Sequence, residues 1–321
     1  MTARDARRSR PAGHLPAIAV AGAVDPAVLR AAGWHVAGRL PATPYDDPGD
    51  APSYVDLDEL LADRRVDAVA LDGDDPRLGP VLPTLRRAGL AVLLTSPAPL
   101  EPARLRAARE VPDAADVAVA LLARWQPWAL TTAAALPLAG GVPLQVTVRG
   151  WPRGEHAAAE LADLAASWGG SVVAAAASPG ALPARELPAG PAGPAVAVAW
   201  SLLLQGGATV LVSHEDAPVR VRLSFAQARL EAGPDGARWE GGAELPLLPV
   251  PDRRAVRRPV PPGTDPGLLA TAEALTHAVG GGDVPAEEWP WPADLGDLLA
   301  AARVLEALRE SATTGERVRT G

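Results

Sequence analysis

The sequence contains neither cysteine nor lysine, and each absence excludes a class of chemistry. Without cysteine the chain forms no disulfide, no thiolate metal site and no thiol nucleophile. All 30 residues in the Lys+Arg count are arginine, so no side-chain amine can serve as a general acid, a Schiff base or a phosphate clamp. Asparagine is also absent, and Ile, Met and Phe occur once each, which indicates a GC-rich genome rather than a selected loss of lysine.

Charge and hydropathy exclude two classes of partner. The formal net charge is −8, whereas a protein that mainly binds nucleic acid needs a basic surface for the phosphates. No apolar run reaches the length needed to span a bilayer, so we expect no membrane partner. Apolar residues make up 48% and charged residues 21% of the chain, which is typical of a globular protein.

The first residues raise the question of export. The stretch "MTARDARRSRPAGHLPAIAVAGAV" superficially resembles an Arg-rich signal sequence with a short apolar core. Its apolar part, "AIAVAG", is brief, runs straight into Asp25-Pro26 and fits a first β-strand. We therefore expect a disordered basic arm over residues 1–15 and a cytoplasmic protein.

The first part of the chain alternates short apolar strands with helices. The pattern predicts strands at 17–22, 34–40, 66–71 and 90–95, and helices at 26–33, 56–63 and 79–89. Strands of this kind, separated by helices, predict a parallel sheet with helices on both faces. We expect a Rossmann-like domain of the NAD(P)-binding type over residues 16–120.

From about residue 117 the pattern changes. The sequence predicts strands at 117–125 and 144–150, helices near 128–138 and at 156–170, and then a series of short strands. In "VRVRLSF" apolar and polar residues alternate, so one face of this strand is buried and the other is solvated. The Gly206-Gly207 and Pro234-Asp235-Gly236 turns predict antiparallel hairpins.

We therefore expect a second α/β domain over residues 121–321, with a large, mostly antiparallel open sheet covered by helices on one face. The stretch 246–266 is rich in proline and arginine and is expected to be a solvated connector. A helix near 266–279 and a closing helix at 294–312 complete the domain, and the closing helix has leucines at helical spacing.

Five stretches in this order resemble the motifs of one protein family. They are "YVDLDELLADRRVDAVAL", "LRRAGLAVLLTSPAPLEPARLRAA", "ARWQP", "LADLAASWGGSVV" and "RVLEALRESATTGERV". Over roughly residues 16–319 the chain resembles the Gfo/Idh/MocA-type oxidoreductases, the glucose–fructose oxidoreductase and inositol dehydrogenase group. The resemblance implies hydride transfer between NAD or NADP and a sugar or polyol. It also implies three functional parts: a glycine-rich loop, a lysine in an EKP motif and an Asp-x-x-x-His pair.

The cofactor positions depart from the family pattern. The G-x-G-x-x-G loop corresponds to "GAVDPA", in which Gly22 keeps the tight turn but Val24 replaces the second glycine. Asp25 adds a carboxylate beside the place of the diphosphate. The acidic residue that usually binds the ribose hydroxyls at the end of the second strand is missing, and Arg39 lies near its position. Arg39 is either a surface arginine or a partner for a 2′-phosphate. Gly73 and Pro97, after the third and fourth strands, complete the candidate cofactor set.

The catalytic positions depart as well. The lysine corresponds to Ser96, whose hydroxyl is poorly suited to donate a proton near neutral pH. On the helix at 156–170, His156 replaces the aspartate, Glu160 replaces the histidine, and a later aspartate is kept as Asp163. His156 and Glu160 are four residues apart, so they either form a proton-shuttling dyad or are a surface ion pair.

A metal site is not expected from the histidines. The five histidines are scattered along the sequence, and only His214-Glu215-Asp216 places one beside carboxylates. This cluster follows a predicted strand and is interpreted as a turn rather than a ligand set.

These departures leave two functions open. The first is a catalytically degenerate homologue that acts as a binding or partner subunit. The second is an active NAD(P)-dependent sugar or polyol oxidoreductase that uses His156 and Glu160. Whether the chain is an enzyme therefore stays open. The resemblance implies NAD or NADP as cofactor, unless binding is lost, and a small sugar- or polyol-like ligand. It also implies a homo-oligomer, or pairing with a paralogue, through the sheet of the second domain.

Overall fold

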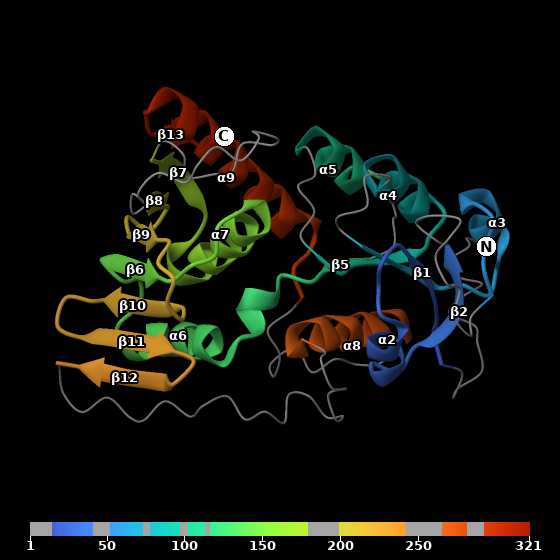
Figure 1. The fold of residues 1–321 in the computed structure, drawn as a ribbon, viewed down its shortest axis with the longest axis horizontal. Coiled ribbons are helices and arrows are strands. Elements are labelled where there is room, and N and C mark those ends of the chain that lie inside the picture. Colours follow the sequence, from blue (N-terminus) through green and yellow to red (C-terminus); the bar gives the residue numbers. More distant parts are fainter. Residues whose placement is uncertain are drawn as a thin grey trace. The chain divides into compact units, whose positions relative to one another are not determined.

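A computed structural model describes residues 15–40, 52–72, 78–96, 102–112, 116–178, 199–241, 265–280 and 292–321. The chain divides into two compact units, each of which collects two separate stretches of sequence. The first unit comprises Met1–Leu122 and Arg253–Leu299, and the second comprises Ala123–Asp252 and Ala300–Gly321. Figure 1 labels most of the elements of both units.

The first unit is built on a five-stranded sheet in the order β2-β1-β3-β4-β5. All four strand pairings are parallel. The strands are β1 (Ala17–Ala21), β2 (His35–Leu40), β3 (Ala68–Leu71), β4 (Ala91–Leu94) and β5 (Val117–Val119). Every residue of β1, β3 and β4 is buried, as expected for strands covered on both faces. The predicted parallel sheet is confirmed.

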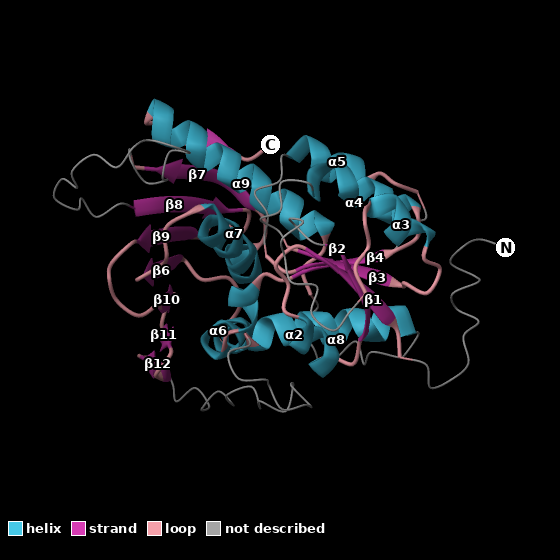
Figure 2. Cartoon of the chain, turned by 45° about the vertical axis from the view of Figure 1, so that its right-hand side comes forward, coloured by secondary structure: helices cyan, strands magenta, loops and turns pink. Residues whose placement is uncertain are grey.

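Five helices surround this sheet: α2 (Pro26–Ala31), α3 (Leu57–Ala62), α4 (Leu78–Arg87), α5 (Pro102–Arg109) and α8 (Pro266–Gly280). In Figure 2, α3, α4 and α5 lie on one face and α2 and α8 on the other.

Helix α8 lies where the sequence did not place it. The sequence assigned all residues from 121 onward to the second domain, whereas α8 packs in the first unit. The Trp34 indole Nε1 donates to the Ala272 carbonyl at 3.0 Å, and the Thr276 hydroxyl donates to the Ala32 carbonyl at 3.0 Å. Leu269 and Leu275 are buried in the same cluster as residues of β1 and α2. Helical periodicity shows that a helix buries one face, but not which sheet that face covers.

The second unit contains an eight-stranded sheet in the order β12-β11-β10-β6-β9-β8-β7-β13. The strands are β6 (Gln145–Arg149), β7 (Val172–Ala177), β8 (Ala199–Leu204), β9 (Thr209–Ser213), β10 (Arg220–Ser224), β11 (Arg229–Gly233), β12 (Gly236–Glu240) and β13 (Val318–Arg319). The β6–β9 pairing is parallel and the other six are antiparallel. The predicted β8–β9 and β11–β12 hairpins are both confirmed.

Helices cover one face of this sheet, as Figure 2 shows. They are α6 (Pro127–Leu138), α7 (Glu155–Gly169) and the part of α9 (Leu295–Thr314) that belongs to the second unit. Their apolar side chains form one core with the inward-facing residues of the strands. Trp168 of α7, Trp200 of β8 and Leu223 of β10 all lie in this core. The fold is therefore the predicted one: a parallel α/β sheet followed by a mostly antiparallel sheet with helices on one side.

One predicted strand is much shorter than expected. The apolar run at 117–125 forms β5 only as far as Val119 and then the 3₁₀ helix η1 (Leu122–Trp125). Strand β4 ends at Leu94, which pairs with Val119, so the ladder cannot continue. Leu121 N–H then bonds back to the Val119 carbonyl, which turns the chain before Pro127 begins α6. Among the described helices, none is long and apolar enough to cross a bilayer.

Candidate functional site

The carboxyl end of β1 is the first part of the candidate site. Gly22 has φ +85°, a left-handed conformation that suits the tight turn the sequence predicted. Val24, at the second motif glycine, is buried and packs in the core of the first unit. The side chain at this position therefore packs in the core of the unit, where the family motif has a glycine without a side chain.

Asp25 occupies the N-terminus of the next helix. Its carboxylate Oδ1 accepts the Ala27 backbone N–H at 2.8 Å, so Asp25 is the N-cap of α2. Pro26 follows at the first helical position and has no N–H to offer. The start of α2 therefore offers fewer backbone N–H groups to a phosphate, and one of them, that of Ala27, is already bound to the Asp25 carboxylate.

Residues 52–54 pair with the end of β2, which the sequence did not predict. Arg39 forms a parallel bridge with Ser53, in which Tyr54 N–H donates to the Arg39 carbonyl at 2.7 Å. The Tyr54 ring lies against Gly38, where a Cβ atom would come within 2.5 Å of Tyr54 Cε2. The Tyr54 hydroxyl donates to Asp63 Oδ2 at 2.9 Å. Burial and this carboxylate raise the pKa of Tyr54 to about 12, so the phenol stays protonated.

Ser96, at the lysine position, faces a carboxylate. Its hydroxyl donates to Asp72 Oδ1 at 3.4 Å, and the neighbouring Thr95 hydroxyl donates to the Leu71 carbonyl at 3.2 Å. Asp72 and Ser96 follow the adjacent strands β3 and β4, which explains why they meet. Gly73 and Pro97, the other candidate residues of these turns, lie outside the described residues.

Taken together, these residues do not fit a dinucleotide. The second glycine is a buried valine, and the helix start is capped by Asp25. A second carboxylate, Asp72, follows β3, which pairs directly with β1. Two negative side chains at this edge of the sheet oppose a diphosphate electrostatically. We therefore derive no reaction step through a nicotinamide.

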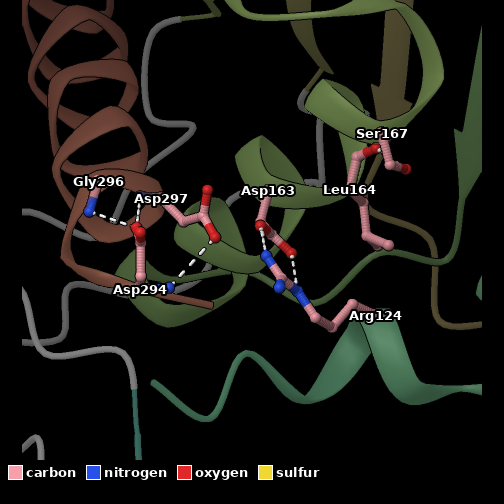
Figure 3. A network of polar contacts seen from close by, with 7 residues as sticks. All are labelled: Arg124, Asp163, Leu164, Ser167, Asp294, Gly296 and Asp297. Atoms are coloured by element: carbon pink, nitrogen blue, oxygen red, sulfur yellow. Dashed lines mark hydrogen bonds and ion pairs between the residues drawn. The ribbon is translucent and has the colours of Figure 1, made fainter. Parts of the chain in front are cut away.

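Helix α7 carries the other three candidate residues. His156 and Glu160 lie in its first two turns, are both partly buried, and have the spacing of residues on one helix face. Asp163 is held by Arg124 of η1, whose Nε donates to Oδ2 at 2.9 Å and whose Nη2 donates to Oδ1 (Figure 3). The side chains of Arg124 and Asp163 are only 17% and 7% exposed. This two-point contact is typical of a structural ion pair.

His214 is the residue whose environment the sequence predicted least well. The sequence placed it in a turn, but it is buried after β9. The centroid of its ring lies 4.3 Å from the centroid of the Trp200 ring. Its Nδ1 lies 2.9 Å from the Trp151 carbonyl oxygen, 63 residues away in sequence. Among the described residues no group of three or more His, Cys, Asp or Glu side chains could hold a metal ion.

Comparisons with known proteins identify the fold. No protein-family model matches the chain, and no curated protein matches its sequence. Solved structures match over almost the whole chain. They include an oxidoreductase from Agrobacterium radiobacter in complex with NAD+, L-tartaric acid and magnesium (16% identity, 96% of this chain and 99% of that chain, TM-score 0.66).

Two further matches are sugar-related enzymes. The aldose–aldose oxidoreductase from Caulobacter crescentus, complexed with glycerol, is 16% identical over 95% of this chain and 100% of its own, with a TM-score of 0.68. The WlbA dehydrogenase from Bordetella pertussis, in complex with NADH and UDP-GlcNAcA, is 15% identical over 95% and 99%, with a TM-score of 0.69. The chain therefore has the fold of the Gfo/Idh/MocA-type oxidoreductases, and at these identities the likeness concerns the fold alone.

Proposed function

We propose that this chain is a catalytically degenerate homologue of the Gfo/Idh/MocA-type oxidoreductases that acts as a binding or partner subunit. The observation that carries the proposal is the carboxylate of Asp25, which caps the helix start that would otherwise receive a diphosphate. The burial of Val24 and the replacement of the lysine by Ser96 support it. Cytoplasmic localisation and a small sugar- or polyol-like ligand belong to the same proposal.

The magnitudes favour loss of dinucleotide affinity. Displacing an N-cap costs about 1 kcal/mol. Two unit charges 4 Å apart repel by about 4 kcal/mol at an effective dielectric constant near 20. Each 1.4 kcal/mol is a tenfold change in the dissociation constant, so the two effects, about 5 kcal/mol together, weaken binding by between three and four orders of magnitude.

Thermal unfolding with each of NAD+, NADH, NADP+ and NADPH tests this proposal. A ligand at 100 times its Kd stabilises a protein by about 2.7 kcal/mol, so tight binding would raise the Tm by several degrees. We expect no shift at millimolar concentrations. An active dehydrogenase of the same fold is the positive control. A clear rise in Tm with a micromolar nucleotide would contradict the proposal.

The face of the eight-stranded sheet that none of the described helices covers supports the partner role. Strands β7, β8 and β9 contain no charged residue. In contrast, β10 and β12 carry Arg222 and Arg238, and both arginines form ion pairs with Glu231 of β11. Leu211 of β9 is 38% exposed and pairs in register with Thr147 of β6. We propose that a second copy, or a paralogue, docks over β7–β9, whose own side chains carry no charge.

Light scattering coupled to size-exclusion chromatography measures this docking. Leu211→Arg would place an unpaired charge in the interface and should reduce the oligomer to a monomer. Val55→Arg is the matched control, because it changes an exposed apolar residue outside the sheet and should leave the oligomer intact. A wild-type monomer, or an oligomer unaffected by Leu211→Arg, would exclude this surface.

The second candidate function is an active oxidoreductase that uses His156 and Glu160. It is favoured by the position of both residues in the first turns of α7, four residues apart and half-buried. This candidate requires nucleotide-dependent turnover of a sugar or polyol by the purified protein. Both His156→Gln and Glu160→Gln should then abolish that turnover without lowering the Tm.

A further inference from the structure

Trp151 connects the end of the central strands to the start of α7. Its backbone N–H donates to the Ser213 carbonyl at 3.3 Å, at the end of β9. Its indole Nε1 donates to the Ala157 carbonyl at 2.8 Å, in the first turn of α7. The ring is buried and packs edge-on against Trp128. Trp151 therefore links the end of β9 to the first turn of α7.

The start of α7 has no side-chain cap among the described residues. Its N-cap is Gly154, with φ +117°, and no side chain accepts a hydrogen bond there. Helix starts leave backbone N–H groups that need partners, and a glycine cap supplies none from its side chain. Glu155 is paired with Arg309 of α9 at the surface. The contacts of Trp151 are thus a buried polar attachment of this end of the helix, beside the buried apolar side chains of residues 157–159.

His214 holds Trp151 in place. The Nδ1 atom of His214 lies 2.9 Å from the Trp151 carbonyl oxygen, which can only accept a hydrogen bond. Nδ1 must therefore carry the proton in the neutral ring, which leaves Nε2 bare. His214 is 8% exposed, and its Nε2 is buried with no hydrogen-bond partner in the described part of the chain.

We propose that His214 is a positioning residue for the start of α7 and that it works only as the neutral imidazole. A second proton would leave the Nδ1–H donor in place but would put a positive charge on a buried ring, against which Trp200 packs without offering an acceptor. This charge is costly unless the ring moves towards solvent and away from Trp151. Acid should therefore release the Trp151 contact and loosen the turns that carry His156 and Glu160. This inference goes beyond the proposed function, because it does not depend on nucleotide binding.

The charges around the ring agree with this direction. Burial, and then Arg153 in the loop before α7, lower the pKa of His214, while the carbonyl oxygens of Trp151 and Pro152 act in the opposite sense. Glu215, next in the chain, accepts the Ser213 hydroxyl at 2.8 Å. The neutral form is favoured in the fold, so its stabilising effect is complete above pH 6.5, the ordinary pKa of histidine. The effect declines as the pH falls from 6.5 towards the lowered pKa of the folded state, where the ring itself takes up the proton.

Hydrogen exchange of the amides of residues 155–160 tests the proposal, after correction for the intrinsic pH dependence of exchange. In the wild type we expect protection to fall at least tenfold between pH 7.5 and pH 4.5. His214→Asn can still donate to the Trp151 carbonyl through its amide but cannot titrate, so its protection should stay constant. His214→Phe loses the donor and should show low protection at both pH values.

His277→Asn is the matched control, because His277 is exposed on α8 in the first unit and its replacement should leave the wild-type response unchanged. The proton NMR titration of the His214 ring in the wild-type chain gives a reading that needs no variant. Its midpoint should lie below 6.5 and coincide with the loss of protection. Equal acid-induced loss in wild type and His214→Asn, or no loss in the wild type, would overturn the proposal.

Discussion

At the scale of single residues, the Arg124–Asp163 pair shows how a motif position can serve the fold. Removing one member of a buried ion pair costs about 3–5 kcal/mol, because the other charge stays buried without this contact. We therefore expect Asp163→Asn to lower the free energy of unfolding by this order, measured by urea denaturation. Replacing both Arg124 and Asp163 by leucine should cost much less, since neither charge remains.

An exposed pair supplies the control for this prediction. Arg220 and Asp235 lie 2.8 Å apart, but their side chains are 47% and 76% exposed. Asp235→Asn should change the free energy of unfolding by less than about 1 kcal/mol, because solvent screens such pairs. A loss at Asp163 no larger than the loss at Asp235 would show that the Arg124 contact contributes little to stability.

At the scale of elements, the edge of the parallel sheet depends on close packing between β2 and residues 52–54. A Cβ atom at Gly38 would come within 2.5 Å of Tyr54 Cε2 and 2.9 Å of the Pro52 carbonyl oxygen. Gly38→Ala should therefore push this segment away from β2 and destabilise the protein by about 1–3 kcal/mol in urea denaturation. Gly280→Ala, where a Cβ atom meets nothing within 4 Å, should be neutral. Equal stability of the two variants would contradict the packing described.

At the scale of the whole molecule, α8 belongs to the first unit although it follows the second in sequence. Leu269 is fully buried against that core, so Leu269→Ala should cost about 2–5 kcal/mol. The loss should be local, and hydrogen exchange should become faster in β1 and β4 but not in β6 and β9. Leu268→Ala is the control, because Leu268 is only partly buried and its truncation should cost less. Faster exchange confined to β6 and β9 would contradict this placement.

Much of the fold was predictable because local patterns determine it. Alternation in "VRVRLSF" predicted β10, whose residues alternate between buried and more exposed positions. The Gly206-Gly207 turn predicted the β8–β9 hairpin, because few residues suit such a turn. The departures of the candidate site were predictable from the family resemblance, which places Val24 at a motif glycine and Ser96 at the motif lysine, with Asp25 beside the place of the diphosphate.

The sequence by itself determined which segments have an apolar face and which chemical groups the chain possesses. The tertiary structure alone decided what each group meets. It joined Arg124 to Asp163 across 39 residues and Trp34 to Ala272 across 238, and it buried His214 beside Trp200. Periodicity describes a surface but not its partner, because burial depends on contacts between residues far apart in the chain.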